Sequence, residues 1–145
     1  MTQILKRTVL FGAGALLVLI GSALMFSPKA FLETSNVFID HDPGLMSELS
    51  APSGLLIIVG ALMILGAVKV RFANLGLSVG AIVYASYGLG RLISMSLNGM
   101  PSESLVAATV IELGIAALLV MLRVTSSPNR QRDQLSSFDR TLGRA

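Results

Sequence analysis

Residues 105–124 read LVAATVIELGIAALLVMLRV, an apolar run of membrane-spanning length with one acidic residue, Glu112, in its interior. The run before it, residues 74–97, reads NLGLSVGAIVYASYGLGRLISMSL and carries Arg91. A helix rises about 1.5 Å per residue, so each run is long enough to cross a hydrocarbon layer of about 30 Å. Both runs are continuous rather than alternating in hydropathy, which indicates helices rather than strands.

Two further apolar runs, Thr8–Phe26 and Ser53–Val70, have the same character. Of the 145 residues, 53% are hydrophobic and 13% are charged, about half the charged fraction of a soluble domain. This composition excludes a disordered chain, a nucleic-acid-binding domain and an ordinary soluble enzyme. We therefore predict an all-α fold, a four-transmembrane-helix bundle over residues 1–124, followed by a polar, basic cytoplasmic tail over residues 125–145.

The first run has an alternative interpretation as a cleaved signal peptide. Lys6 and Arg7 precede it, and small residues at 21–23 resemble a cleavage site. We expect a retained helix, and the mass of the mature protein distinguishes the two.

The connections between the runs differ in length. Residues 27–52 are expected to form a long outer loop between the first two helices, because this segment is rich in helix breakers. These breakers are Pro28, Pro43, Gly44 and Pro52. Val70–Ala73 is expected to be a tight turn that makes the second and third helices antiparallel neighbours. Asn98–Pro101 is another expected turn, with Ser102 or Ser104 able to cap the fourth helix.

Basic residues flanking the runs are distributed unevenly. Nine of the eleven Lys and Arg residues lie on one side of such a bundle, namely Lys6, Arg7, Lys69, Arg71, Arg123, Arg130, Arg132, Arg140 and Arg144. The other side has Lys29 against Glu33, Asp40, Asp42, Glu48 and Glu103. Because basic flanks stay in the cytoplasm, we predict that both termini are cytoplasmic. The basic tail is interpreted as a topology determinant with weak attraction for anionic lipid, or alternatively as a partner-docking segment.

Arg91 and Glu112 are the two ionisable residues well inside the runs. A charge at the centre of a membrane helix costs about 2.5–3.5 kcal/mol, so such residues normally face protein or water and find a partner. Arg91 is about six residues, roughly 9 Å, before the end of its run, and Glu112 is about seven residues, roughly 10 Å, after the start of its run. Since consecutive helices are antiparallel, the two depths match, and we predict an intramembrane ion pair in the outer half of the bilayer.

A polar stripe follows one face of the third run, because its members are spaced by four and three residues. They are Gly80, Tyr84, Tyr87, Arg91, Ser94 and Asn98. Tyr84, Tyr87 and Thr109 are able to hydrogen-bond with the ion pair. The cluster has two interpretations, a buried polar lock that sets helix register or a pocket for a small ligand, proton or head group. A conduction path is disfavoured, because the inner halves of the helices supply almost no polar side chains.

Glycine residues recur within the apolar runs. Gly76 and Gly80 are spaced as a small-xxx-small pair, and Gly60 marks the second run, which indicates close helix packing within the bundle or, alternatively, between molecules. The segment Asp40–Asp42 (DHD) is interpreted as a solvated turn, with a metal or pH-sensitive site as the alternative. There is no cysteine, and no catalytic or cofactor motif is recognised, so we expect neither a metal nor a cofactor.

Four short motifs carry a family resemblance. They are ELSAPSGL at residues 48–55, GRLIS at residues 90–94, NGMP at residues 98–101 and Glu112-Leu113. Together they resemble a bacterial family of small four-helix membrane proteins of unknown function, loosely similar to DoxX-like proteins. Ser50, Ser53 and Asn98 depart from that family's usual Arg, Gly and Asp. The resemblance implies an inner-membrane location, a four-helix bundle and no assigned reaction, and it places Glu48 near enough to join Arg91 and Glu112.

Three functions follow as hypotheses. The first is a non-enzymatic accessory or interaction subunit of a larger membrane complex, or a self-associating protein, with the lipid bilayer as its surroundings and no nucleic-acid partner. The second is a small-ligand or lipid-binding protein whose outer-leaflet polar pocket surrounds Arg91 and Glu112. The third, suggested only by the DoxX-like similarity, is a quinone-linked redox subunit.

Overall fold

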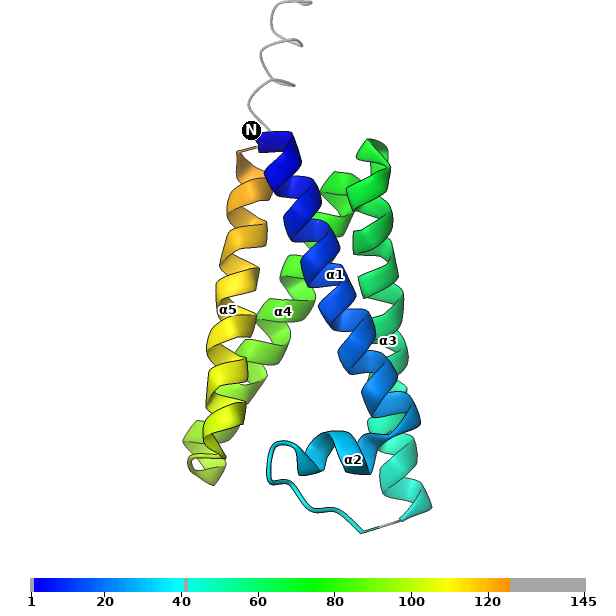
Figure 1. The fold of residues 1–145 in the computed structure, drawn as a ribbon. Helices are drawn as coiled ribbons and strands as arrows, with labels where there is room; N and C mark the ends of the chain where they lie inside the picture. Colours follow the sequence, from blue (N-terminus) through cyan, green and yellow to red (C-terminus); the bar gives the residue numbers. More distant parts are fainter. Residues whose placement is uncertain (1, 41, 126–145) are drawn as a thin grey trace, which may run out of the picture.

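The computed structural model describes residues 2–40 and 42–125, which form five helices and no strand (Figure 1). The helices are α1 (Thr2–Phe26), α2 (Pro28–Glu33), α3 (Pro43–Val68), α4 (Val70–Asn98) and α5 (Glu103–Val124). The four long helices are each long and apolar enough to cross a membrane. The predicted all-α fold with four apolar spans is therefore confirmed, whereas the predicted tail beyond residue 125 lies outside the described residues.

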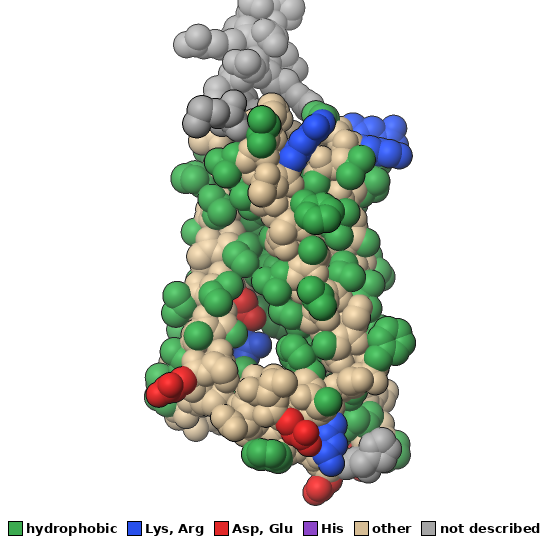
Figure 2. All heavy atoms as spheres, viewed as in Figure 1, with side chains coloured by type: hydrophobic (Ala, Val, Ile, Leu, Met, Phe, Trp, Pro, Cys, Tyr) green, Lys and Arg blue, Asp and Glu red, His purple; other side chains and the backbone are tan. Residues whose placement is uncertain are grey.

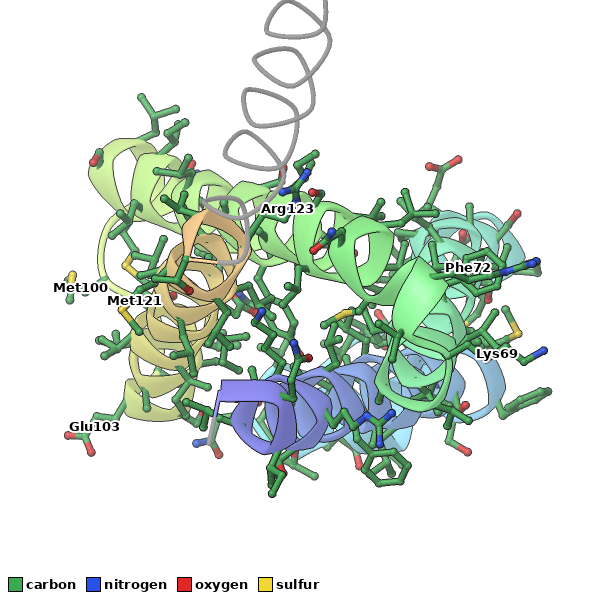
Figure 3. All side chains as sticks on the ribbon, turned by 90° about the horizontal axis from the view of Figure 1, so that it is seen from above. Lys69, Phe72, Met100, Glu103, Met121 and Arg123 are labelled. Carbon is green, nitrogen blue, oxygen red and sulfur yellow. The ribbon has the colours of Figure 1, made fainter. Side chains whose placement is uncertain are left out.

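The long helices pack as two pairs. α1 packs most extensively against α3, and α4 against α5, while α3 and α4 join the pairs. Viewed along the bundle in Figure 3, the four helices surround a common centre. α1 and α5 touch each other little, and they diverge toward the end of the bundle where α2 lies (Figure 1). We call this the α2 end.

Glycine allows α1 and α3 to approach closely where they cross. A Cβ atom added to Gly60 would lie 2.5 Å from the carbonyl oxygen of Gly14, so the two backbones touch. Gly76 and Gly80 of α4 lie against Met63 of α3, because an added Cβ atom would lie 3.3 Å from the Met63 Cα at Gly76 and 2.6 Å from the Met63 sulfur at Gly80. All three glycines expected to act in helix packing therefore pack within the chain.

The predicted long loop over residues 27–52 is wrong in its extent. α2 forms within it, and α3 begins at Pro43 rather than near Ser53. The Asp42 carboxylate accepts a hydrogen bond from the backbone N–H of Leu45 at 2.7 Å, so it caps the helix. Pro43 follows in the first helical turn, where no N–H is needed.

Pro52, which we expected to break the chain, lies inside α3. Proline removes the hydrogen bond that its N–H would donate to the carbonyl four residues earlier. The next residue, Ser53, is fully buried, and its hydroxyl donates to the Leu49 carbonyl at 2.7 Å. Burial of Ser53 and Leu56 within the bundle holds the helix together through the proline.

The expected turn over Val70–Ala73 is wrong, because these residues form the first turn of α4. Lys69 alone separates α3 from α4, with extended backbone angles, and its N–H donates to the Leu65 carbonyl at 2.7 Å. The two helices are antiparallel neighbours, as expected (Figure 1). At the other end, Ser102 is the N-cap residue of α5, but its hydroxyl contacts the Ser104 hydroxyl at 3.0 Å rather than the helix backbone.

Candidate functional site

The polar stripe of α4 runs from the core of the bundle to its surface. Gly80 and Tyr84 are buried, Tyr87 and Arg91 are partly exposed, and Ser94 and Asn98 are exposed, as is Gly99 beyond them. The gradient arises because α1 diverges from α5 toward the α2 end (Figure 1). One helix face therefore contributes to the core at one end and to a hollow at the other.

Arg91 and Glu112 meet in this hollow. The Nε of Arg91 lies 3.2 Å from Oε2 and 3.3 Å from Oε1 of Glu112, so one N–H group is shared by both carboxylate oxygens. The Glu112 side chain is 14% exposed and that of Arg91 is 34% exposed. The contact joins α4 to α5 at the height expected from their sequence depths.

A second polar contact joins the same two helices near their other ends. The Nε of Arg123 donates to the Ser78 hydroxyl at 3.1 Å. Figure 3 shows Arg123 lying over α4, whereas Lys69 and Glu103 point outward. The α4–α5 pair is therefore tied by an arginine at each end, and the contact at the α2 end is the one that faces a hollow.

Two of the three hydroxyls expected to bond with the ion pair do not do so. The Tyr84 hydroxyl is buried and donates to the Ala13 carbonyl of α1 at 2.7 Å. The Thr109 hydroxyl donates to the Leu105 carbonyl of its own helix at 2.9 Å. These predictions are wrong, because nearby backbone carbonyls on the packed helices satisfy both hydroxyls. The Tyr87 hydroxyl makes no hydrogen bond within residues 2–40 and 42–125.

The hollow is a cavity of about 470 Å³, which we call the lateral cavity. Its walls are mostly aliphatic and come from all five helices, with Phe31 of α2 and Pro52 of α3 at the α2 end; Tyr84, Tyr87, Arg91 and Glu112 lie along one side. The aliphatic wall residues include Leu16, Leu17, Ile20, Leu24, Leu32, Val37, Leu49, Leu56, Val83, Leu105, Ala108 and Ile111. Figure 2 shows the opening between α5 and α1, with an acidic and a basic side chain inside it.

A smaller cavity of about 270 Å³ lies where α4 turns into α5. We call it the turn cavity. Arg91, Ser94 and Asn98 supply its polar groups, and the Asn98 amide nitrogen donates to the Ser94 hydroxyl at 3.3 Å. The other lining residues are Met95, Gly99, Met100, Pro101 and Leu105. Arg91 and Leu105 line both cavities, so these two side chains lie between them.

Glu48 does not join the ion pair. It is exposed, and it makes no salt bridge or side-chain hydrogen bond in the described part of the chain. Its neighbours on α3, Leu49 and Pro52, line the lateral cavity instead. Consecutive helical residues point about 100° apart, so extending α3 back to Pro43 turns Glu48 away from the cavity that Leu49 lines.

The lateral cavity itself was not expected from the sequence. It depends on α2, which brings Phe31 and Leu32 beneath the opening. The available sequence signal was Ser27-Pro28, an N-cap residue followed by a first-turn proline, which predicts the start of α2. Asp42-Pro43 gives the same signal for the start of α3. The possible metal ligand His41 lies outside the described residues, and the described Asp42 acts as a helix cap.

A family model described as Domain of unknown function (DUF4345) matches residues 5–123. No curated protein and no solved structure matches the chain. Because the match covers most of its length, the chain belongs to the DUF4345 family, which supports the resemblance to a family of unknown function.

Proposed function

We propose that this member of the DUF4345 family binds a membrane-soluble amphiphile, a lipid or lipid-like molecule, in the lateral cavity. The observation that carries the proposal is an aliphatic cavity of about 470 Å³ bordered by a half-buried ion pair. Small-molecule sites typically measure about 300–1,000 Å³ and combine apolar walls with a few polar groups that orient the ligand.

The position of the opening supports a ligand that arrives from the membrane. The cavity opens sideways between α1 and α5 (Figure 2), and both helices are apolar enough to cross a bilayer. Ile111 on the cavity wall is 55% exposed. An acyl chain would therefore reach the cavity without crossing a polar surface.

The ion pair is the second support. Charged residues inside membrane proteins are costly and commonly mark functional sites. A lock that only set helix register would be most effective within close packing, whereas Arg91 and Glu112 both border a cavity. The Tyr87 hydroxyl beside them is available to a polar head group.

Filling the cavity tests this function. Ala108 lines the lateral cavity, and its neighbour Ala107 is exposed and does not line it. We expect native mass spectrometry of the wild-type protein released from membranes to show a bound lipid, retained by Ala107→Phe and lost by Ala108→Phe. Equal retention in both folded variants, or no bound lipid in the wild type, would count against the proposal.

We further propose a bacterial inner-membrane location with both termini in the cytoplasm. Among the described residues, the end of the bundle holding the N-terminus carries Lys6, Arg7, Lys69, Arg71 and Arg123. The α2 end has mostly acidic side chains. This distribution agrees with the tendency of basic loops to remain cytoplasmic.

Cysteine labelling tests the orientation cleanly, because the chain has no cysteine of its own. Lys69→Cys and Glu103→Cys place one thiol at each end of the bundle, and both side chains point outward (Figure 3). An impermeant thiol reagent added to intact cells should label the variant at 103 and not the one at 69. The opposite pattern would reverse the proposed topology.

The second candidate function is an accessory subunit of a larger membrane complex. It is favoured by the exposed face of α5 that carries Ala107, Gly114 and Ala117, since small residues let membrane helices approach closely. A Cβ atom added to Gly114 would meet nothing within 4 Å, so Gly114→Leu should fold normally. Its larger side chain should block close helix approach, so the variant should lose a partner that the wild type retains in mild detergent. A wild-type protein recovered only as a monomer would argue against this role.

A further inference from the structure

We propose that the bound amphiphile carries an oxyanionic head group, a phosphate or a carboxylate, which Arg91 holds in the turn cavity while the apolar chain occupies the lateral cavity. This inference rests on the proposed function and adds the chemical class of the ligand. It assigns separate tasks to the two cavities that share Arg91.

The unused hydrogen-bonding capacity of Arg91 is the first argument. A guanidinium has five N–H donors and no acceptor. Glu112 engages only the Nε–H group, and the four N–H groups on the two terminal nitrogens donate to no acceptor within the described residues. Arginine donors pair best with carboxylate and phosphate oxygens, since charge-assisted bonds are stronger than neutral ones.

The lining of the turn cavity is the second argument. None of the residues that border it is acidic, and Glu112 borders only the lateral cavity. The Ser94 hydroxyl accepts from Asn98 at 3.3 Å, so its own proton remains able to point into the cavity. Arg91 and Ser94 therefore offer donors to a bound group, which suits an anion and opposes a cationic head.

The junction at Arg91 is the third argument. Because Arg91 and Leu105 line both cavities, the two cavities are neighbours, and a molecule whose chain lies in the lateral cavity can bring its head to the same guanidinium. The exposed end of α4 leaves the head near water, where an anion keeps part of its hydration.

Binding of matched probes to the purified full-length chain in detergent tests the head-group class. Oleate and phosphatidylglycerol carry an anionic head, monoolein carries the same chain on a neutral head, and inorganic phosphate carries no chain. We expect the two anionic amphiphiles to bind about tenfold or more tightly than monoolein, as a charge-assisted hydrogen bond implies. We expect inorganic phosphate to displace neither oleate nor phosphatidylglycerol, because phosphate lacks the apolar chain.

Variants of the turn cavity separate the head site from the chain site. Ser94→Ala combined with Asn98→Leu leaves the Arg91–Glu112 contact in place and should weaken oleate binding several-fold without changing monoolein binding. Ser96→Ala is the matched control, because Ser96 is exposed on α4, bonds to the Leu92 carbonyl and does not line the turn cavity. It should bind all probes as wild type does.

The outcomes distinguish the two proposals. Equal binding of oleate, phosphatidylglycerol and monoolein would overturn the oxyanion inference and leave the lateral-cavity function standing. Displacement of oleate by inorganic phosphate alone would show a site for free anions and would also overturn it. Failure of every amphiphile to bind would overturn both the inference and the proposed function.

Discussion

Replacing the two members of the ion pair singly and together should reveal strong energetic coupling between α4 and α5. The variants are Arg91→Met, Glu112→Leu and the double variant, which keep side-chain volume while removing charge. Arg91→Met leaves a carboxylate that is only 14% exposed without its partner. We expect this variant to lose about 1–3 kcal/mol of unfolding free energy, the cost of an unsatisfied buried polar group.

The reverse single variant should cost less. Glu112→Leu leaves Arg91, whose side chain is 34% exposed and borders the turn cavity, so the guanidinium keeps access to water. The double variant should be close to wild type, because replacing both members of a buried pair with apolar groups is often neutral. We therefore expect a coupling energy of at least about 1–3 kcal/mol in the double-mutant cycle, since the costs of the two single variants add up in it.

Reversible unfolding in mixed micelles measures the cycle, with retention of helical content as the control for folding. Additive effects of the two single variants would mean that the 3.2 Å contact between Arg91 and Glu112 contributes no net interaction, which is the opposite of the expected coupling. The double variant also separates two roles of the pair. A folded double variant that no longer binds an anionic amphiphile, yet still binds its neutral analogue, assigns the pair to ligand recognition rather than to stability alone.

Two further predictions concern packing. Gly60→Ala should destabilise the protein by about 1–3 kcal/mol, because the new Cβ would lie 2.5 Å from the Gly14 carbonyl oxygen and force α1 and α3 apart. Gly114→Ala, whose new Cβ meets open space, is the control and should leave the stability unchanged or raise it. Thermal denaturation measures both variants. Tyr84→Phe should cost about 0.5–1.5 kcal/mol in the same assay, because it removes the buried hydrogen bond to the Ala13 carbonyl; an unchanged midpoint would show that this bond contributes nothing.

The presence of four apolar spans and the meeting of Arg91 with Glu112 could be predicted from local information. Hydropathy and length define the helices, and antiparallel neighbours place residues counted from a shared turn at equal depth. The packing of Gly60 against Gly14 agrees with the general use of small residues between membrane helices. Each helix depends on residues that are close in sequence, and the equal depth of Arg91 and Glu112 depends on the fixed rise of a helix.

The lateral cavity depends on how the helices are arranged relative to one another, which the spacing of apolar residues along the sequence does not reveal. The segment from Asp42 to Pro52 holds both helix-starting and helix-breaking residues, and none of them is buried. The Asp42 cap starts the helix, which continues past Pro52 to the buried Ser53 and Leu56. The Tyr84 hydroxyl finds a carbonyl 71 residues away, so its direction depends on where α1 crosses α4. The divergence of α1 from α5 is likewise a property of the whole bundle rather than of either helix.

Photocrosslinking with a lipid that carries a reactive group on its acyl chain tests the central claim most directly, because it reports where the chain lies. We expect crosslinks to residues on the cavity walls, such as Leu24, Leu32 and Leu49, and their loss in Ala108→Phe. Crosslinks confined to the outward-facing Ile58, Ile82 and Val110, unchanged by that substitution, would contradict it.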